Sequence, residues 1–456
     1  MVGMDVRQSP GSLGLGLGMA VVLLVGCGSG GGGGPAATAG AEASAVAAAD
    51  LREGTAPTLR ERAERGLAIS PVPVDTSRGE GLRLLVGLGS YIVNAASDCA
   101  GCHSGQAGFL SGGNPFPLDG AGHVVFSRNL TPDPATGLPL SFPQFLEAIR
   151  TGRDFHPGET AQLVVMPWTT LRWASDLDLA AIYAYLRAVP AVSNHVPPDV
   201  KSDLPLPAAV PFPRRLYTDG DVTRRLTGEF TSFGVARGLE ISPLAQPRVR
   251  LDQVVEYGRG SYIANATAHC NDCHTHPDRS PDQRKVNTAD FLTGGTVFNT
   301  PPPLRPLQRT VRATSANLKG VNYGFFGEPD DTFGRFSAIM STGTLVDETP
   351  ARPLAFPMNL VAPNLAKLLP GDLHAVYVYV KNAPSTSGAS DVPHQPPARW
   401  CAADADCAAG EACAPATNEC VGGACSADLD CGTCQTCGAG LCQAPAAGSA
   451  CVAGAQ

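Results

Sequence analysis

Two copies of one five-residue pattern constrain the fold of this chain more than any other feature. The pattern C-x-x-C-H reads Cys99-Ala100-Gly101-Cys102-His103 in the first copy and Cys270-Asn271-Asp272-Cys273-His274 in the second. Two thiols at this spacing can form thioether bonds to the two vinyl groups of one haem, and the following histidine can ligate the iron. The alternative for a single copy is a redox or zinc C-x-x-C that precedes a histidine by chance. Two copies in similar flanks favour two covalently bound haem c groups, with His103 and His274 as proximal ligands.

The two patterns lie within a longer internal repeat. Gly89–Asn94 precedes the first pattern at the distance at which Gly260–Asn265 precedes the second. Farther along, Phe109–Gly113 matches Phe291–Gly295, with a longer insert before the second of these segments. The chain is therefore predicted to contain two related units, each with a helix that leads into C-x-x-C-H.

A second helix is expected to close each unit. In the first unit Leu179, Ile182 and Leu186 fall on one helical face, and the second unit repeats this face. Gly89 and Gly260 lie on the leading helices, although glycine costs a helix about 1 kcal/mol relative to alanine. Their recurrence predicts a close approach between two helix backbones in each unit.

Several segments carry a resemblance to a known family: Asp98–His103, Asn129–Pro134, Met166–Trp168, Ala181–Leu186, Arg259–Tyr262 and His269–Thr275. Each unit resembles the class I cytochrome c domain. More narrowly, the chain resembles the multihaem cytochrome c subunits of membrane-associated alcohol, aldehyde and gluconate dehydrogenases. The resemblance covers about 79–386 and implies a mainly α fold with two tandem cytochrome c domains and long irregular loops. Those subunits typically carry three haems, whereas this chain has two motifs.

The resemblance also implies a distal methionine in each domain. Met166 and Met358 occupy similar places, each shortly before a closing helix and each beside a proline that can fix the loop. We therefore predict Met166 and Met358 as distal ligands, with a packing role as the alternative. Met340 falls in an expected helix and is predicted to pack in the core. Histidines that could replace a methionine as ligand are His123, His156 and His374.

Axial ligation by histidine and methionine points to electron transfer. A thioether ligand favours Fe(II) and raises the reduction potential, and it leaves no open position for peroxide or oxygen. The sequence therefore predicts an electron carrier, not an enzyme, that passes single electrons between redox protein partners such as a dehydrogenase and a terminal acceptor. The alternatives are a dihaem enzyme of the peroxidase or thiosulfate dehydrogenase type, and a surface binding protein built on the C-terminal tail.

The N-terminus predicts export. An apolar run over Leu13–Gly26 suits a signal peptide and ends in Leu24-Val25-Gly26-Cys27, which resembles a bacterial lipobox with Cys27 as the lipidation site. An ordinary cleaved signal peptide with a chance cysteine is the alternative. We expect a membrane-anchored lipoprotein in the periplasm or on the outer membrane. The formal net charge of -8 gives no reason to expect nucleic acid as a partner.

Ten cysteines between Cys401 and Cys451 set the C-terminal tail apart. A segment with so few apolar side chains needs covalent staples, so about five disulfides are expected, in an oxidising compartment. Its two C-x-x-C pairs lack a following histidine, so no third haem is predicted; zinc is the alternative. Binding, surface display and a passive stalk all remain open as roles for the tail.

These features divide the chain into six parts. An Arg- and Glu-rich run at 60–65 is expected to be a short exposed helix. The expected parts are a signal peptide with the lipobox cysteine (1–27), a Gly- and Ala-rich tether (28–78), domain 1 (79–190), a Pro-rich linker (191–251), domain 2 (252–386) and the Cys-rich disulfide tail (387–456).

Overall fold

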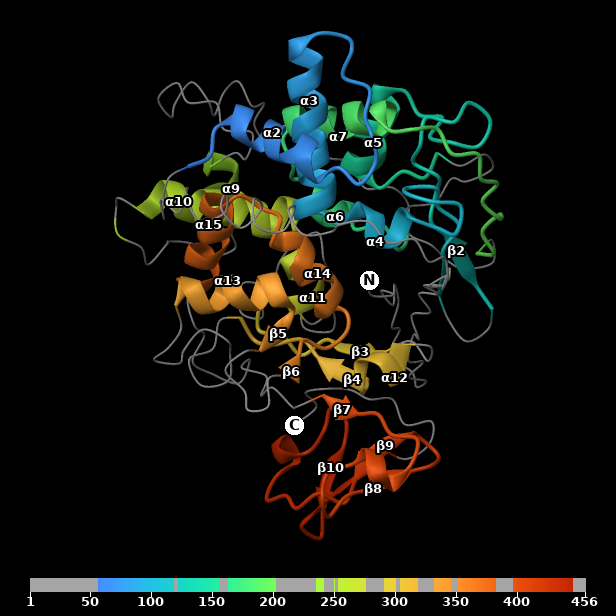
Figure 1. Ribbon diagram of the computed structural model, residues 1–456, viewed down its shortest axis with the longest axis vertical. Coiled ribbons are helices and arrows are strands. Elements are labelled where there is room, and N and C mark those ends of the chain that lie inside the picture. The colour runs from blue at the N-terminus through green and yellow to red at the C-terminus, as the bar shows by residue number, and fades with distance from the viewer. Residues whose placement is uncertain are drawn as a thin grey trace, which may run out of the picture.

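The computed structural model describes residues 56–118, 122–155, 163–201, 235–241, 250, 253–275, 291–300, 304–318, 332–345, 352–382 and 397–445. Cys27 and His156 lie outside these residues. No helix in the described part of the chain is long and apolar enough to cross a membrane. The structure is mainly helical with several small sheets, and Figure 1 shows its helices gathered on one side and a strand-rich C-terminal unit on the other.

The two halves of the helical part repeat one order of elements. We call them the first repeat and the second repeat. The elements of the first repeat are α2 (Leu59–Ile69), α3 (Glu80–Tyr91), the π-helical turn η1 (Ile92–Ala96), α4 (Cys99–His103), β1 (Pro115–Pro117), β2 (Val124–Phe126), α5 (Phe142–Thr151), α6 (Trp168–Leu171) and α7 (Asp176–Ala188). Those of the second are α9 (Val235–Ile241), α10 (Val254–Tyr262), the π-helical turn η3 (Ile263–Thr267), α11 (Cys270–His274), β3 (Val297–Asn299), α12 (Arg305–Gln308), β4 (Thr310–Thr314), α13 (Phe333–Thr342), β5 (Thr344–Leu345), β6 (Arg352–Pro353), α14 (Met358–Leu365) and α15 (Pro370–Lys381).

Glycines let the leading and closing helices cross closely, as the sequence predicts. A Cβ atom at Gly89 on α3 would lie 1.9 Å from the carbonyl oxygen of Ala181 on α7. A Cβ atom at Gly260 on α10 would lie 1.8 Å from the carbonyl oxygen of Ala375 on α15. Both distances are far below van der Waals contact, so the crossing in each repeat requires glycine.

The helix α2 differs from the expected exposed helix. Its N-terminus is fixed by a capping box between Thr58 and Glu61, and its residues Arg62, Ala63 and Gly66 are buried. It packs against α3 as α9 packs against α10. This charged segment is therefore a packed helix. Its Arg62 guanidinium can be buried because it forms an ion pair with a carboxylate inside the protein.

That partner belongs to the other repeat. Arg62 donates through Nε and Nη2 to the two oxygens of Asp372, both at 2.7 Å, and both side chains are fully buried. Tyr91 at the end of α3 also donates to Asp372, at 2.9 Å. In the second repeat Tyr262 at the end of α10 donates to Asp178 of the first repeat, at 2.6 Å. The repeats thus interlock through matching tyrosine–aspartate contacts in both directions.

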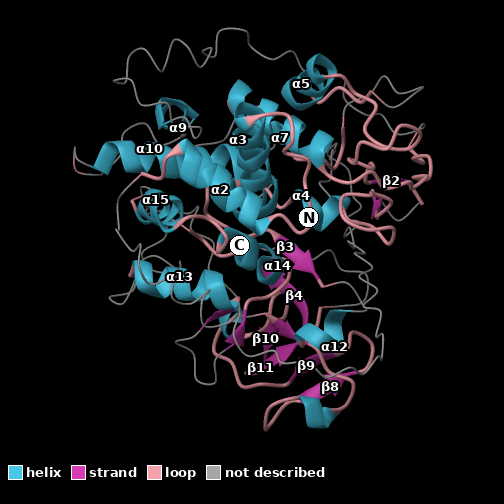
Figure 2. Cartoon of the chain, turned by 45° about the horizontal axis from the view of Figure 1, so that its top comes forward, coloured by secondary structure: helices cyan, strands magenta, loops and turns pink. Residues whose placement is uncertain are grey.

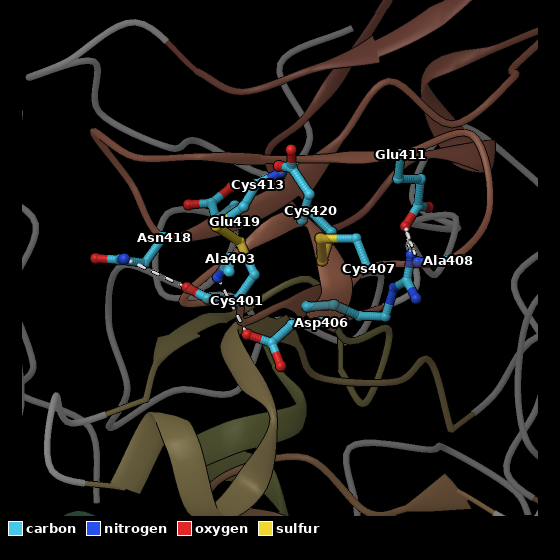
Figure 3. Close-up of a disulfide and its surroundings, with 12 residues drawn as sticks. Cys401, Ala403, Asp406, Cys407, Ala408, Glu411, Cys413, Asn418, Glu419 and Cys420 are labelled. Carbon is cyan, nitrogen blue, oxygen red and sulfur yellow. Dashed lines mark hydrogen bonds and ion pairs between the residues drawn. A yellow bond between two sulfur atoms is a disulfide. The ribbon is translucent and has the colours of Figure 1, made fainter.

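The C-terminal part is a cysteine-rich unit, which we define as residues 397–445. Its strands are β7 (Ala398–Arg399), β8 (Ala412–Ala414), β9 (Glu419–Val421), β10 (Thr436–Gly438) and β11 (Leu441–Gln443). The four disulfides whose partners are both described are Cys401–Cys413, Cys407–Cys420, Cys425–Cys437 and Cys431–Cys442. Cys434 is disulfide-bonded as well. The expectation that disulfides order the tail is confirmed, and Figure 3 shows the first two of them together.

The cysteine-rich unit is joined to the second repeat by a sheet. Strand β4 pairs with β3 on one edge and with β7 on the other, both antiparallel. Figure 2 shows β3 beside α14, with β4 and the strands of the unit below it. The tail therefore continues the sheet of the second repeat.

Candidate haem sites

Each C-x-x-C-H forms one short helix behind a π-helical turn. After η1 the chain takes a left-handed conformation at Asp98 (φ 46°) and then enters α4. After η3 it does the same at His269 (φ 57°) before α11. Residues three apart on a helix lie on the same face, so the two cysteines of each motif point the same way. All four motif cysteines are free thiols, as thioether formation requires.

Both motif histidines make the same second hydrogen bond. The Nδ1 atom of His103 lies 2.8 Å from the carbonyl oxygen of Arg128, and Nδ1 of His274 lies 2.8 Å from that of Ala316. A carbonyl oxygen can only accept, so Nδ1 carries the hydrogen and Nε2 of the neutral ring keeps its lone pair. Burial lowers the pKa of the His103 imidazole, which favours this neutral form. Each histidine is thus prepared as a metal ligand through Nε2.

A cavity of about 940 Å³ opens beside the first motif. Cofactor pockets typically measure about 300–1,000 Å³, so a haem is a suitable occupant. Cys102, His103 and Met166 all line it. Apolar side chains that line it further are Phe116, Phe145, Ile149, Leu171, Leu179, Ile182 and Leu186. Thiols, an imidazole and a thioether in one apolar cavity fit a covalently attached haem.

The segment that carries Met166 is held in place by its neighbours. Trp168, two residues on, donates its indole N–H to the carbonyl of Leu163 at 3.1 Å. Its ring lies against Gly152, where a Cβ atom would come within 2.4 Å, and Gly152 has a positive φ of 74°. The loop before α6 therefore has a defined shape over the cavity.

In the second repeat the predicted methionine lies differently: Pro357 caps α14 as Pro167 caps α6, so Met358 follows the cap whereas Met166 precedes it. Met358 is the first residue of α14, and it packs against the main apolar core. Met340 lies on α13 and is buried, as its expected packing role requires. His374 bonds Glu256 through Nδ1 at 2.6 Å, and lies on the closing helix α15. His123 precedes β2 and is absent from the lining of the cavity.

The packing of one motif against the other repeat could not be foreseen from either motif alone. Thr170 on α6 donates to the carboxylate of Asp272 at 2.7 Å, within the second motif. His269 lines the cavity of the first repeat. Conversely, Asp98 faces Asn364 and Lys367 from the second repeat. Each motif thus contacts the segment that follows the predicted methionine ligand of the other repeat.

Buried ionisable groups surround these contacts. Burial raises the pKa of the Asp272 carboxyl to about 7 and that of Asp98 to about 6. Burial lowers the pKa of His269 to about 4. These groups are therefore largely uncharged in the mildly acidic range, which suits an apolar boundary between two sites.

The chain is similar in sequence to subunits of several redox proteins. No known protein-family model matches it. It is 28% identical over 296 residues to a nicotinate dehydrogenase subunit of Pseudomonas putida, covering 64% of this chain and 21% of that protein. It is 24% identical to the fructose dehydrogenase cytochrome subunit of Gluconobacter japonicus, covering 70% of this chain and 57% of that protein. A diheme cytochrome c-type protein of Cereibacter sphaeroides is 28% identical over 40% of this chain and 54% of its own length.

The matched regions span less than two thirds of each of these relatives. Their names describe two dehydrogenase subunits, one of them a cytochrome subunit, and a diheme cytochrome. The chain is similar in sequence to the multihaem cytochrome c subunits of dehydrogenases.

Proposed function

We propose that this protein is an exported dihaem c-type cytochrome that transfers single electrons between redox protein partners. Its two repeats are tandem class I cytochrome c domains that cover 79–190 and 252–386 and are extended at their N-terminal ends by α2 and α9. Each carries one covalently bound haem c. The observation that carries the proposal is the pair of histidine Nδ1 contacts to carbonyl oxygens, which leave Nε2 of both motif histidines as ligand atoms.

The roles of the motif residues follow from their chemistry. Cys99 and Cys102 bind the first haem through thioethers, and Cys270 and Cys273 bind the second. His103 and His274 are proximal iron ligands. When bound, the haem iron supplies a site that accepts and releases one electron.

Methionine ligands complete the two sites. Met166 is the distal ligand of the first haem, and its place in the cavity with Cys102 and His103 supports this role. Met358 is the distal ligand of the second, supported by its position shortly before the closing helix α15, as Met166 lies shortly before α7. Filled axial positions suit a carrier, because no position remains for a substrate on the iron.

Location and partners follow from the chain around the domains. Disulfides in the cysteine-rich unit support an oxidising compartment. Lipidation at Cys27 anchors the protein to a membrane. The tether is the part of the expected 28–78 segment that precedes α2, because α2 itself packs against α3. A dehydrogenase is the proposed electron donor, because the relatives include subunits of nicotinate and fructose dehydrogenases.

Counting covalent haems tests this function. The full chain is produced in a host that matures c-type cytochromes, and its mass is measured. The wild type is expected to carry two haems, and Cys99→Ser/Cys102→Ser and Cys270→Ser/Cys273→Ser are expected to carry one each. Cys27→Ser is the matched control: it keeps both haems but leaves the membrane fraction. A wild-type chain without covalent haem overturns the proposal.

A further inference from the structure

We propose that the cysteine-rich unit is a positioning element for the second haem. It holds the strand β4, and through that strand it fixes the carbonyl group that orients His274. This inference rests on the proposed function, because it concerns the proximal ligand of a bound haem. It assigns the tail a role in setting the properties of one of the two redox centres.

The contact begins at the carbonyl of Ala316, which accepts from His274 Nδ1 at 2.8 Å. Ala316 lies two residues beyond the end of β4. The inner edge of β4 pairs with β3, and Ser315 continues this ladder by donating its N–H to Thr296 at 2.8 Å. The position of the carbonyl therefore depends on the position of β4.

The outer edge of β4 belongs to the cysteine-rich unit. Arg399 and Ala398 of β7 pair with Thr310 and Arg312 of β4, and Trp400 donates its N–H to the carbonyl of Arg309 at 3.0 Å. Without β7 this edge of β4 would be an unpaired strand edge. The unit thus completes the sheet.

Buried side chains strengthen the same contact. Arg312 on β4 meets Glu419 on β9 at 2.6 Å, and the Glu419 side chain is fully buried while that of Arg312 is 12% exposed. Gln435 donates to the same carboxylate at 3.3 Å. The hydroxyls of Thr314 and Thr433 lie 3.0 Å apart, also buried. Breaking a buried ion pair leaves an uncompensated charge, so the contact between Arg312 and Glu419 resists separation of the unit from β4.

Disulfides make this support rigid. Cys401 lies just beyond the strand β7, and its bond to Cys413 ties β7 to β8. Cys407 is bonded to Cys420, the neighbour of Glu419 on β9 (Figure 3). Two of the groups that contact β4, the strand β7 and Glu419, are therefore held by disulfides within 401–420.

In the first repeat the motif histidine also bonds a carbonyl that follows a strand. There the strand is supported by residues 199–201. His103 bonds the carbonyl of Arg128, which follows the strand β2. Val200 bridges to Val124 of β2, and Asp199 accepts from the N–H of Phe126 at 2.9 Å. The Asp199 carboxylate also binds the Arg128 side chain at 2.6 Å. Each histidine is thus oriented by a carbonyl whose strand is supported from outside its own repeat, by 199–201 in one case and by the cysteine-rich unit in the other.

The experiment is a redox titration of the full-length, haem-loaded protein, with electron paramagnetic resonance of both oxidised haems. Glu419→Gln keeps the shape of the side chain but removes its charge beside Arg312. A weaker bond from Nδ1–H to the carbonyl makes the imidazole a poorer electron donor. We therefore expect one midpoint potential to rise and the g values of one haem to shift.

Three matched variants complete the test. Asp199→Asn is expected to shift the other haem, because it weakens the equivalent support in the first repeat. Asp430→Asn removes a carboxylate that accepts from Ser426 and Ala427 within the cysteine-rich unit, and it should shift neither haem. If Glu419→Gln fails to fold, Thr433→Val takes its place, since it removes only the hydroxyl facing Thr314.

The outcomes separate the two claims. The inference is overturned if Glu419→Gln, or Thr433→Val in its place, leaves both haems unchanged or shifts the haem that Asp199→Asn shifts. In either case two titrating haems would still support the proposed function. A chain without covalent haem would instead reject the proposed function itself.

Discussion

The hydroxyl of Tyr262 donates to the Asp178 carboxylate at 2.6 Å, and joins the helix before the second haem motif to the helix that closes the first repeat. Tyr91 makes the matching contact to Asp372 at 2.9 Å in the opposite direction. All four side chains are buried. The two proposed cytochrome domains therefore share one core boundary, with each leading helix fixed to the other closing helix.

Removing one of these hydroxyls is expected to destabilise the folded protein. A hydrogen bond to a charged group contributes about 1.5–3 kcal/mol, so Tyr262→Phe should lower the free energy of unfolding by about 2 kcal/mol. Tyr183→Phe is the control, because its hydroxyl donates to the uncharged carbonyl of Leu140 within one repeat, at 2.9 Å. Denaturant titration measures both. If both substitutions lower the free energy of unfolding equally, the contact between the repeats adds no more stability than a hydrogen bond within one repeat.

The helix crossings predict a sharper effect. Gly89→Ala would place its Cβ 1.9 Å from the carbonyl oxygen of Ala181, so α3 and α7 must separate, and a loss of at least about 3 kcal/mol is expected. Gly81→Ala on the same helix meets nothing within 4 Å, and it should stabilise by about 0.5–1 kcal/mol. Thermal unfolding of the two variants decides the point. A tolerated Gly89→Ala would contradict the close crossing.

Methionine ligation predicts separable spectral changes. Met166→Ala should remove the sulfur-to-iron band of one haem and lower its midpoint potential, because the thioether favours Fe(II). Met358→Ala should do the same for the other haem. Met340→Leu substitutes a buried packing residue, and it should leave the band at full intensity. Retention of the full band in Met166→Ala would require a different distal ligand.

The pKa of Asp98 predicts a pH dependence of stability. Burial raises this pKa from 3.8 to about 6, so the folded chain binds the proton more tightly than the unfolded chain. Stability from this group is therefore greatest below about pH 4 and is lost as the pH rises through about 6. At about 1.4 kcal/mol per pKa unit, the change is at most about 3 kcal/mol.

Asp98→Asn should remove that part of the pH dependence when unfolding is measured between pH 4 and 7. Asp75→Asn is the control with the opposite sign. Hydrogen bonds from Ser77 lower the pKa of the exposed Asp75, so its contribution is lost as the pH falls. Identical pH profiles for the wild type and Asp98→Asn would contradict the assigned burial of this carboxyl.

Local features of the sequence predicted local features of the fold. The repeated glycines Gly89 and Gly260 predicted the helix crossings in both repeats. The motif spacing predicted that two cysteines would share one face. In each case the information lies within a few residues, where helix geometry alone decides the outcome.

Contacts between distant segments were not predictable in the same way. In the sequence, Arg62 is indistinguishable from a surface arginine. In the structure it is buried in an ion pair with Asp372, which lies far along the chain. The sequence of the tail indicates an independent disulfide-rich unit. In the structure its strand β7 pairs with β4 of the second repeat. Both depend on how the two repeats and the tail pack, and no spacing within one segment encodes that arrangement.

A potentiometric titration of the purified full-length protein tests the central claim most directly, with optical and electron paramagnetic resonance spectra recorded at each potential. We expect two one-electron steps and two haems that are low-spin and six-coordinate in both oxidation states, with no reaction on adding peroxide. A high-spin haem, or one that reacts with peroxide, would contradict the proposed electron carrier and indicate a dihaem enzyme in its place.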